Sequence, residues 1–353
     1  RTLDNQPDRI LTTIMAPYMS CGARLTVYAL FASAFFPSGG QNIVFALYLI
    51  GIVAAVLSAL VVRRYLLKAP ESHFLLELPA YHLPTLKGLV LQTWQRLKGF
   101  VLRAGKAIVT VVVVLNMVNS IGTDGSFGNQ NSDASLLSAI GRTITPAFAP
   151  IGIHEDNWQA TVGIFTGMFA KEVVVGTLDA LYSPKPADGE VDLSDQLAAA
   201  FASVPANLRD VGNSLLDPLG VSLSSYDSAD SAAEDQNVAT STLARLQASF
   251  DGQLGAFSYL LFILLYMPCV ATIGVIFKEI GAFWAGFSAA WSVVMAYTAA
   301  VLCYQIGSLS GNPGGALSTI TLVVAVALGL FTALVRYGRR QQPPLIPLVH
   351  LDG

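Results

Sequence analysis

Charge, cysteine and histidine are all scarce in this sequence. Charged residues make up 12% of the 353 residues and hydrophobic residues make up 53%, whereas soluble proteins carry about 25% charged residues. Three widely spaced cysteines exclude a disulfide scaffold, and a net charge of −3 argues against nucleic acid as a partner. The composition therefore predicts an all-α, polytopic integral membrane protein surrounded by the lipid bilayer.

Signatures of common enzyme sites are also missing. The sequence has no G-x-x-x-x-G-K-[ST] phosphate loop, no G-x-G-x-x-G motif, no G-x-S-x-G elbow and no H-E-x-x-H pair. No two of its four histidines are close enough to form a metal pair on one helix. We therefore expect no catalytic residue and no cofactor-binding residue in this chain.

Apolar runs recur along the chain, and several are long enough to cross a bilayer core. Candidate segments lie at residues 10–36, 42–62, 106–121, 134–151, 158–182, 256–277, 283–307 and 316–335. Several contain proline, glycine or charge, which are tolerated at membrane depth where the broken backbone packs on protein or lines a cavity. The pattern predicts about seven or eight membrane segments, with broken or re-entrant helices among them.

The connections between these segments differ in charge. Residues 63–106 carry eight basic and two acidic residues, and residues 84–106 are predicted to form a basic amphipathic helix on the membrane surface. Residues 183–254 carry eleven acidic and three basic residues and are predicted to be a polar loop. Because basic loops stay in the cytoplasm, residues 63–106 and 336–353 are expected inside and residues 183–254 outside.

The first candidate site interrupts an apolar segment at residues 16–24. Pro17 removes a backbone donor and Gly22 loosens the chain, so an unwound stretch is expected at membrane depth. It places a thioether, a hydroxyl and a thiol together, from Met19, Ser20 and Cys21, and these groups suit a borderline-soft cation. The alternative is a kinked helix with a small-residue packing face.

The second candidate site repeats the first. Tyr-Met-Pro-Cys-Val-Ala at residues 266–271 matches Tyr-Met-Ser-Cys-Gly-Ala at residues 18–23. Here Met267, Pro268 and Cys269 stand in the middle of an apolar run. Interrupted segments at matching places in two halves of a chain point to a transporter binding site.

A third site is the charged pair Lys171 and Glu172 inside residues 158–182. Ionisable residues within a membrane segment are functional candidates by default. The second such pair, Lys278 and Glu279, follows its apolar run and is expected to be a solvated helix end.

Taken in order, these segments resemble the FeoB-type ferrous iron transporter family. Residues 16–28 resemble its first Gate motif, with Thr26 where the family has proline. Residues 77–84, 166–178 and 266–272 resemble its ELPPYRLP segment, its TGxxAKEVVVGTL motif and its second Gate motif. The resemblance covers the chain from residue 1 to about residue 340.

The resemblance implies transport of Fe²⁺ across a bacterial cytoplasmic (inner) membrane, with Cys21 and Cys269 as the main metal ligands. Weaker candidates are Met19, Ser20, Met267 and Glu172. Candidate pore or gating residues are Pro17, Gly22, Arg24, Lys171 and Pro268. The parts of the chain are then a first Gate region (1–62), a basic cytoplasmic segment (63–106), a central membrane region (107–182), an acidic loop (183–254), a second Gate region (255–335) and a cytoplasmic tail (336–353).

The family also carries an N-terminal GTP-binding domain that uses GTP and Mg²⁺, and it works with small cytoplasmic accessory proteins. No such domain is recognisable here, so the chain is expected to be the membrane portion of a longer transporter and not itself an enzyme. A homo-oligomer stays open. Two alternatives also stay open: a nucleoside-type carrier of organic solutes, and a membrane enzyme that uses a thiol nucleophile.

Overall fold

The computed structural model describes residues 5–37, 39–67, 85–130, 132, 134–169, 171, 173–183, 202–203, 205, 240–311 and 313–340. In these ranges the chain is helical, apart from two isolated β-bridges near residues 121–135. The helices are α1 (Gln6–Met15), η1 (Ala16–Tyr18), α2 (Gly22–Phe35), α3 (Gly40–Tyr65), α4 (Leu86–Ser120), α5 (Leu136–Ile144), η2 (Thr145–Ile151), α6 (Trp158–Phe169), α7 (Val173–Tyr182), α10 (Thr240–Ser249), α11 (Gly252–Leu265), α12 (Val270–Ile280), α13 (Ala282–Gly307) and α14 (Pro313–Arg340).

Within the described part of the chain, four helical stretches are long and apolar enough to cross a membrane: α3, the α11–α12 stretch Gly252–Ile280, α13 and Pro313–Ala333 of α14. α3 exposes one apolar face, including Phe45, Ile52 and Val56, while Leu47 and Ala54 are buried against the protein. The exposed face suits lipid and the buried face suits the bundle. The prediction of an all-α membrane protein is confirmed.

α4 is one continuous helix, where the sequence suggested a surface helix followed by a membrane span. It runs from Leu86 to Ser120, and the hydroxyl of Thr85 caps its start by accepting a hydrogen bond from the Gly88 amide at 3.3 Å. Thirty-five residues extend about 52 Å at 1.5 Å per residue, well beyond a core of about 30 Å. No proline interrupts these residues, so nothing in the sequence ends the helix between its basic half and its apolar half.

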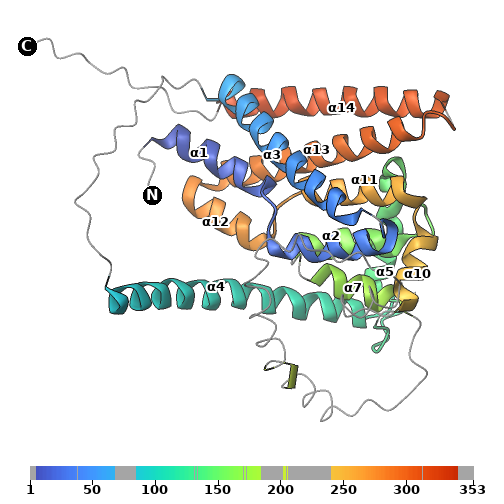
Figure 1. The fold of residues 1–353 in the computed structure, drawn as a ribbon, viewed down its shortest axis with the longest axis horizontal. Coiled ribbons are helices and arrows are strands. Elements are labelled where there is room, and N and C mark those ends of the chain that lie inside the picture. The colour runs from blue at the N-terminus through green and yellow to red at the C-terminus, as the bar shows by residue number, and fades with distance from the viewer. Residues whose placement is uncertain are drawn as a thin grey trace, which may run out of the picture.

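Two broken helices, α1–α2 and α11–α12, lie side by side and run in opposite directions (Figure 1). The ring of Phe31 in α2 stacks on Tyr259 in α11 with centroids 5.0 Å apart. One turn later in α2, the Phe35 carbonyl accepts a hydrogen bond from Gln253 at 3.0 Å. In these contacts, residue numbers fall along α11 as they rise along α2, so the two helices are antiparallel. The broken helix α1–α2 is therefore antiparallel to the broken helix α11–α12, and their two breaks lie beside each other at the same height in the bundle.

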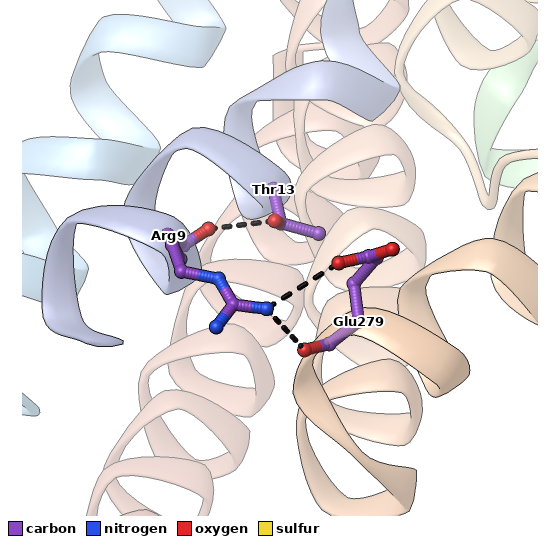
Figure 2. Close-up of polar contacts among 3 residues, drawn as sticks. All are labelled: Arg9, Thr13 and Glu279. Atoms are coloured by element: carbon purple, nitrogen blue, oxygen red, sulfur yellow. Dashed lines mark hydrogen bonds and ion pairs between the residues drawn. The ribbon is translucent and has the colours of Figure 1, made fainter. Parts of the chain in front are cut away.

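The far ends of the same broken helices also meet. Arg9 Nη2 in α1 donates to the Glu279 carbonyl at 3.1 Å and lies 3.3 Å from its carboxylate Oε2 in α12 (Figure 2). Both side chains are about one-third exposed, at 35% and 38%. Lys278 is exposed. The helix end at Lys278 and Glu279, which the sequence predicts to be solvated, therefore also contacts α1.

α6 and α7 form an antiparallel hairpin, where the sequence suggested a single membrane segment at residues 158–182. Gly163 in α6 faces Leu178 in α7, and Gly167 faces Val174. The chain reverses between Phe169 and Val173. The two glycines, one turn apart on one face, allow the branched side chains of α7 to approach closely, which favours a hairpin over a straight span.

The tip of this hairpin lies at the level of the second break. Tyr259 in α11 donates to the Ala160 carbonyl in α6 at 3.1 Å, and the Tyr266 hydroxyl lies beside Gly167. In these two contacts, residue numbers rise in the same direction along both helices, so α6 and α11 run parallel. α11 ends at Leu265 and α6 ends at Phe169, so both helices stop in the same region of the bundle.

Candidate metal site at the helix breaks

The first break has a local cause. α1 ends at Met15, and Pro17 falls in the short turn η1, whose hydrogen bond runs from the Met19 amide to the Ala16 carbonyl at 3.2 Å. Met19 and Cys21 are extended, and Cys21 is the N-cap residue of α2 with no side-chain capping bond. The Cys21 thiol is therefore at the positive end of the α2 helix dipole.

The second break has the same form. α11 ends at Leu265, residues 266–269 lie outside any helix, and Cys269 is the N-cap residue of α12, again without a side-chain capping bond. Pro268 is buried in this stretch, as Pro17 is in the first. Each cysteine thus begins the second half of a broken helix.

Lys171, at the tip of the α6–α7 hairpin, brings the two breaks together. Its side chain is 4% exposed, and its Nζ lies 4.4 Å from the centroid of the Tyr266 ring. It interacts electrostatically with Cys21, Cys269 and Arg24. Cys21 and Cys269 therefore both lie near this buried lysine side chain.

The region around Lys171 holds buried polar atoms that lack partners. We call it the break cluster: Tyr18, Ser20, Cys21, Arg24, Tyr28, Lys171, Tyr266 and Cys269. Within the described ranges seven buried side-chain polar atoms make no well-formed hydrogen bond, and six of them belong to the break cluster: the hydroxyls of Tyr18, Ser20, Tyr28 and Tyr266, Nε of Arg24 and Nζ of Lys171. Of these, the Tyr28 hydroxyl lies near Ser20 and the Tyr18 hydroxyl near Ser58 of α3. Buried polar groups are normally satisfied, so this concentration marks a place for water or an ion.

The predicted ligands differ in their surroundings. Cys21 is exposed, whereas Cys269 is partly buried, with its Sγ 3.2 Å from the Thr272 hydroxyl. The Met19 side chain is 56% exposed, and its carbonyl is taken by Arg24 Nη1 at 3.2 Å. Ser20 and Met267 are partly buried. Glu172 lies outside the described residues.

Across the ranges that the structure describes, no three His, Cys, Asp or Glu side chains come close enough to hold a metal ion. The break cluster can offer two thiols, the Ser20 hydroxyl, backbone carbonyls and water. Such a set binds a borderline-soft divalent ion less tightly than a Cys₄ cage, which suits an ion that must be released.

Sequence reasoning missed one residue that positions the first break. A Cβ on Gly51 of α3 would lie 2.8 Å from the Tyr18 carbonyl oxygen, so only glycine allows α3 to pack directly on the broken backbone. Tyr18 itself is buried. The available signal was a lone glycine in the middle of an apolar span, where small residues mark close helix contacts.

The chain is similar to two family profiles. Residues 44–96 match "Ferrous iron transport protein B C terminus", and residues 101–283, just over half of the chain, match "Gate: Nucleoside recognition". Curated relatives named "Fe(2+) transporter FeoB" are 46% identical over 96% of this chain in Legionella pneumophila (strain Paris) and 42% identical over 95% in Escherichia coli (strain K12). The chain belongs to the FeoB family of Gate proteins.

The FeoB relatives are longer than this chain. The match covers 44% of the Legionella protein, and 42% of a further relative from Salmonella typhimurium (strain LT2) that is 43% identical over 95% of this chain. No solved structure matches. Family membership and the apolar helices together make the chain a multi-pass protein of the bacterial inner membrane.

Proposed function

We propose that this chain forms the ion path of a ferrous iron transporter, with Fe²⁺ as cargo and the break cluster as its central site. The observation that carries the proposal is that two N-cap thiols, on two antiparallel broken helices, converge on one buried polar cluster. Thiolate favours Fe²⁺ over Mg²⁺ and Ca²⁺, which prefer oxygen ligands. The name of the curated relatives agrees with this cargo.

We also propose a topology of six crossings, made by α1–α2, α3, α4, α11–α12, α13 and α14. Figure 1 shows the starts of α1 and α4 and the end of α14 at one end of the molecule, with α10 at the other. Arg63 and Arg64 close α3, and Arg336 lies in the last turns of α14, so the positive-inside rule makes the first end cytoplasmic. The α6–α7 hairpin then enters from the outside, with α5–η2 beside it. With the hairpin and α5–η2 counted as one segment each, the chain has eight membrane segments in all.

Two Gate-type repeats with opposite orientation explain this topology. The antiparallel packing of α1–α2 on α11–α12 and the shared Tyr-Met-x-Cys-x-Ala motif support an inverted repeat around the break cluster. Pro17 and Pro268 interrupt the two helices, and the buried side chains of Arg24 and Lys171 lie where the ion would pass.

The partners of this membrane part are proposals as well. A GTP-binding domain of the same protein, using GTP and Mg²⁺, and small cytoplasmic accessory proteins would act from the cytoplasmic end. The basic part of α4, from Lys87 to Lys106, offers a docking surface there, with Lys87, Lys98 and Lys106 exposed beside Trp94 and Leu97.

The experiment is anaerobic Fe²⁺ uptake by cells that produce the protein from its complete gene. Cys21→Ser and Cys269→Ser are each expected to lose most uptake at matched membrane levels. Cys303→Ser is the matched control, because Cys303 is a partly buried thiol in α13 packed against the hydrophobic core. Normal uptake by both break variants would overturn the assignment of the thiols.

A nucleoside-type carrier is the second candidate, because the longer family match is described as nucleoside recognition. The break cluster contains thiols, hydroxyls and cations but no amide side chain, and amides are the groups expected to read a sugar and base. Excess nucleoside is therefore expected to leave Fe²⁺ uptake unchanged. Competition by nucleoside would favour this second candidate.

A further inference from the structure

An apolar pocket lies beside the second break, between α5, η2, α6, α11 and α13. Its volume is about 260 Å³, and its wall is formed mainly by aliphatic and aromatic side chains. The ring of Phe148 in η2 meets the ring of Phe262 in α11 edge to face, with centroids 5.5 Å apart. α5 gives way here to η2, whose two prolines prevent a regular helix from filling the space.

The surface that this pocket presents is almost entirely apolar. The two polar side chains in its wall are Thr161 and Tyr266. The Thr161 hydroxyl accepts a hydrogen bond from Thr145 at 3.0 Å, and the Tyr266 hydroxyl lies beside Gly167 of α6. Apolar cavities of this kind stay dry and take up apolar molecules, because a buried water needs several polar partners. The pocket therefore suits an apolar occupant.

The pocket opens at the depth of the bilayer core. Val293 is near the middle of α13 and Phe262 is near the middle of the stretch Gly252–Ile280, and both stretches are long and apolar enough to cross a membrane. The most exposed side chains in the wall are Ile144 at 37% and Val293 at 38%, whereas Phe262 and Val162 are buried. The mouth is therefore between α5 and α13, and it continues the surface that the membrane helices expose to lipid.

We propose that this pocket is a lipid site, which takes one acyl chain of a phospholipid from the surrounding bilayer. Acyl chains fill the hydrocarbon core, and headgroups lie at its two surfaces, so the depth of the mouth selects the chain and not the headgroup. An empty pocket would leave its wall without dispersion contacts, which an acyl chain restores. The inference rests on the membrane location of the protein and not on the proposed ion path.

An acyl chain in this pocket would pack behind the second break. Tyr266 is the first residue after α11, and Met168 is the residue before the end of α6. Both side chains belong to the wall of the pocket. The chain would therefore contact the end of α11 and the end of α6 together, and it would support both elements where they stop inside the bundle.

The test is photolabelling of the full-length protein reconstituted in vesicles of phosphatidylethanolamine and phosphatidylglycerol. The probe is a trace of phospholipid that carries a diazirine in the middle of one acyl chain, and mass spectrometry locates the labelled residues. Phe262 is expected to be labelled several-fold more than Leu261, its neighbour on α11. Both side chains are buried, at 4% and 6% exposure, but of the two it is Phe262 that lines the pocket.

Two variants close the mouth from opposite sides. Val293→Trp on α13 and Ile144→Trp on α5 are each expected to reduce labelling of Phe262 several-fold, because the indole takes the place of the acyl chain. Both positions are partly exposed, so a larger side chain can be accommodated without disturbing the core. The matched controls are Val326→Trp on α14 and Ile306→Trp near the end of α13, which are exposed outside the pocket.

Three results would overturn the proposal. The first is equal labelling of Phe262 and Leu261. The second is labelling of Phe262 that both mouth variants leave unchanged. The third is protection of Phe262 in vesicles that is lost when the protein is monomeric in detergent with the same probe, which would assign the pocket to a second copy of the chain. Fe²⁺ uptake is not a readout here, so the assignment of the thiols is tested separately.

A thermal measurement checks the same site without the probe. Phospholipid added to the purified protein in detergent is expected to raise the unfolding temperature of the unmodified protein, because it binds the folded state. The rise is expected to be smaller in Val293→Trp, whose pocket is closed, and undiminished in the control Val326→Trp. Equal rises in all three proteins would overturn the proposal.

Discussion

The two breaks share a motif but differ three residues after each cysteine. In the first break this position is Arg24, a buried cation whose Nη1 donates to the Met19 carbonyl. In the second it is Thr272, whose hydroxyl lies 3.2 Å from the Cys269 sulfur. The first thiol is exposed beside a fixed charge, and the second is partly buried beside a neutral hydroxyl. Matching backbones thus present two chemically different ligands.

The support behind the breaks differs too. The first is packed against α3 through the contact between Gly51 and the Tyr18 carbonyl, whereas the second is packed against the hairpin through Tyr266 and Gly167. One break rests on a helix that crosses the bundle, and the other rests on a short element that ends beside it. A substitution in α3 at this contact should therefore disturb the first break more than the second, and a substitution in the hairpin should disturb the second break more than the first.

The largest effect is expected from Gly51→Val. Its Cβ would meet the Tyr18 carbonyl oxygen at 2.8 Å, and a backbone atom held by packing cannot move aside easily. Overpacking of this kind costs about 1–3 kcal/mol, and the first break should be displaced from the cluster. The measurement is thermal unfolding in detergent together with Co²⁺ binding. Gly329→Val, at an open position on α14, is the control, and equal unfolding temperatures for the two variants would contradict the prediction.

The next effects test the two matched positions directly. Arg24→Met removes a charge-assisted hydrogen bond and leaves the Met19 carbonyl without this donor, so a loss of about 1.5–3 kcal/mol is expected. Thr272→Val removes a neutral contact to sulfur and is expected to cost at most about 1 kcal/mol. The free energies of unfolding of both variants, measured by denaturant titration, check that Arg24→Met costs more than Thr272→Val. Equal costs would mean that the two positions play the same structural part.

How far the sequence predicts this structure follows from the same contacts. Pro17 and Pro268 indicate where the two helices break, because proline acts locally. Re-entrant segments were predicted, but the reversal within residues 158–182 was not, because these residues are apolar and long enough to span a bilayer, and the reversal depends on Gly163 and Gly167 meeting α7. The contact of Gly51 with Tyr18 and the meeting of Lys171 with both cysteines join residues far apart in the chain, which no local pattern encodes.

A smaller effect is expected where Arg9 and Glu279 join the outer halves of the two broken helices. Both side chains are about one-third exposed, and exposed ion pairs contribute about 0–1 kcal/mol. Arg9→Gln, Glu279→Gln and the double variant, compared by thermal unfolding, should give a coupling energy in that range. A coupling well above it would indicate that this contact, and not the break cluster, holds the two broken helices together.

The smallest effect is expected from Gly22→Ala, although Gly22 is part of the first motif. An added Cβ would meet nothing within 4 Å, and Gly22 is not among the glycines with positive φ. The matching residue after Cys269 is Val270, so the second break forms with a branched side chain in the same place. Alanine also favours the first turn of α2 by up to about 1 kcal/mol over glycine. Unchanged Fe²⁺ uptake with equal or slightly higher stability is the expected result. Loss of uptake at unchanged stability would instead make Gly22 a hinge that moves as the ion passes. The first break would then differ from the second in function as well as in structure.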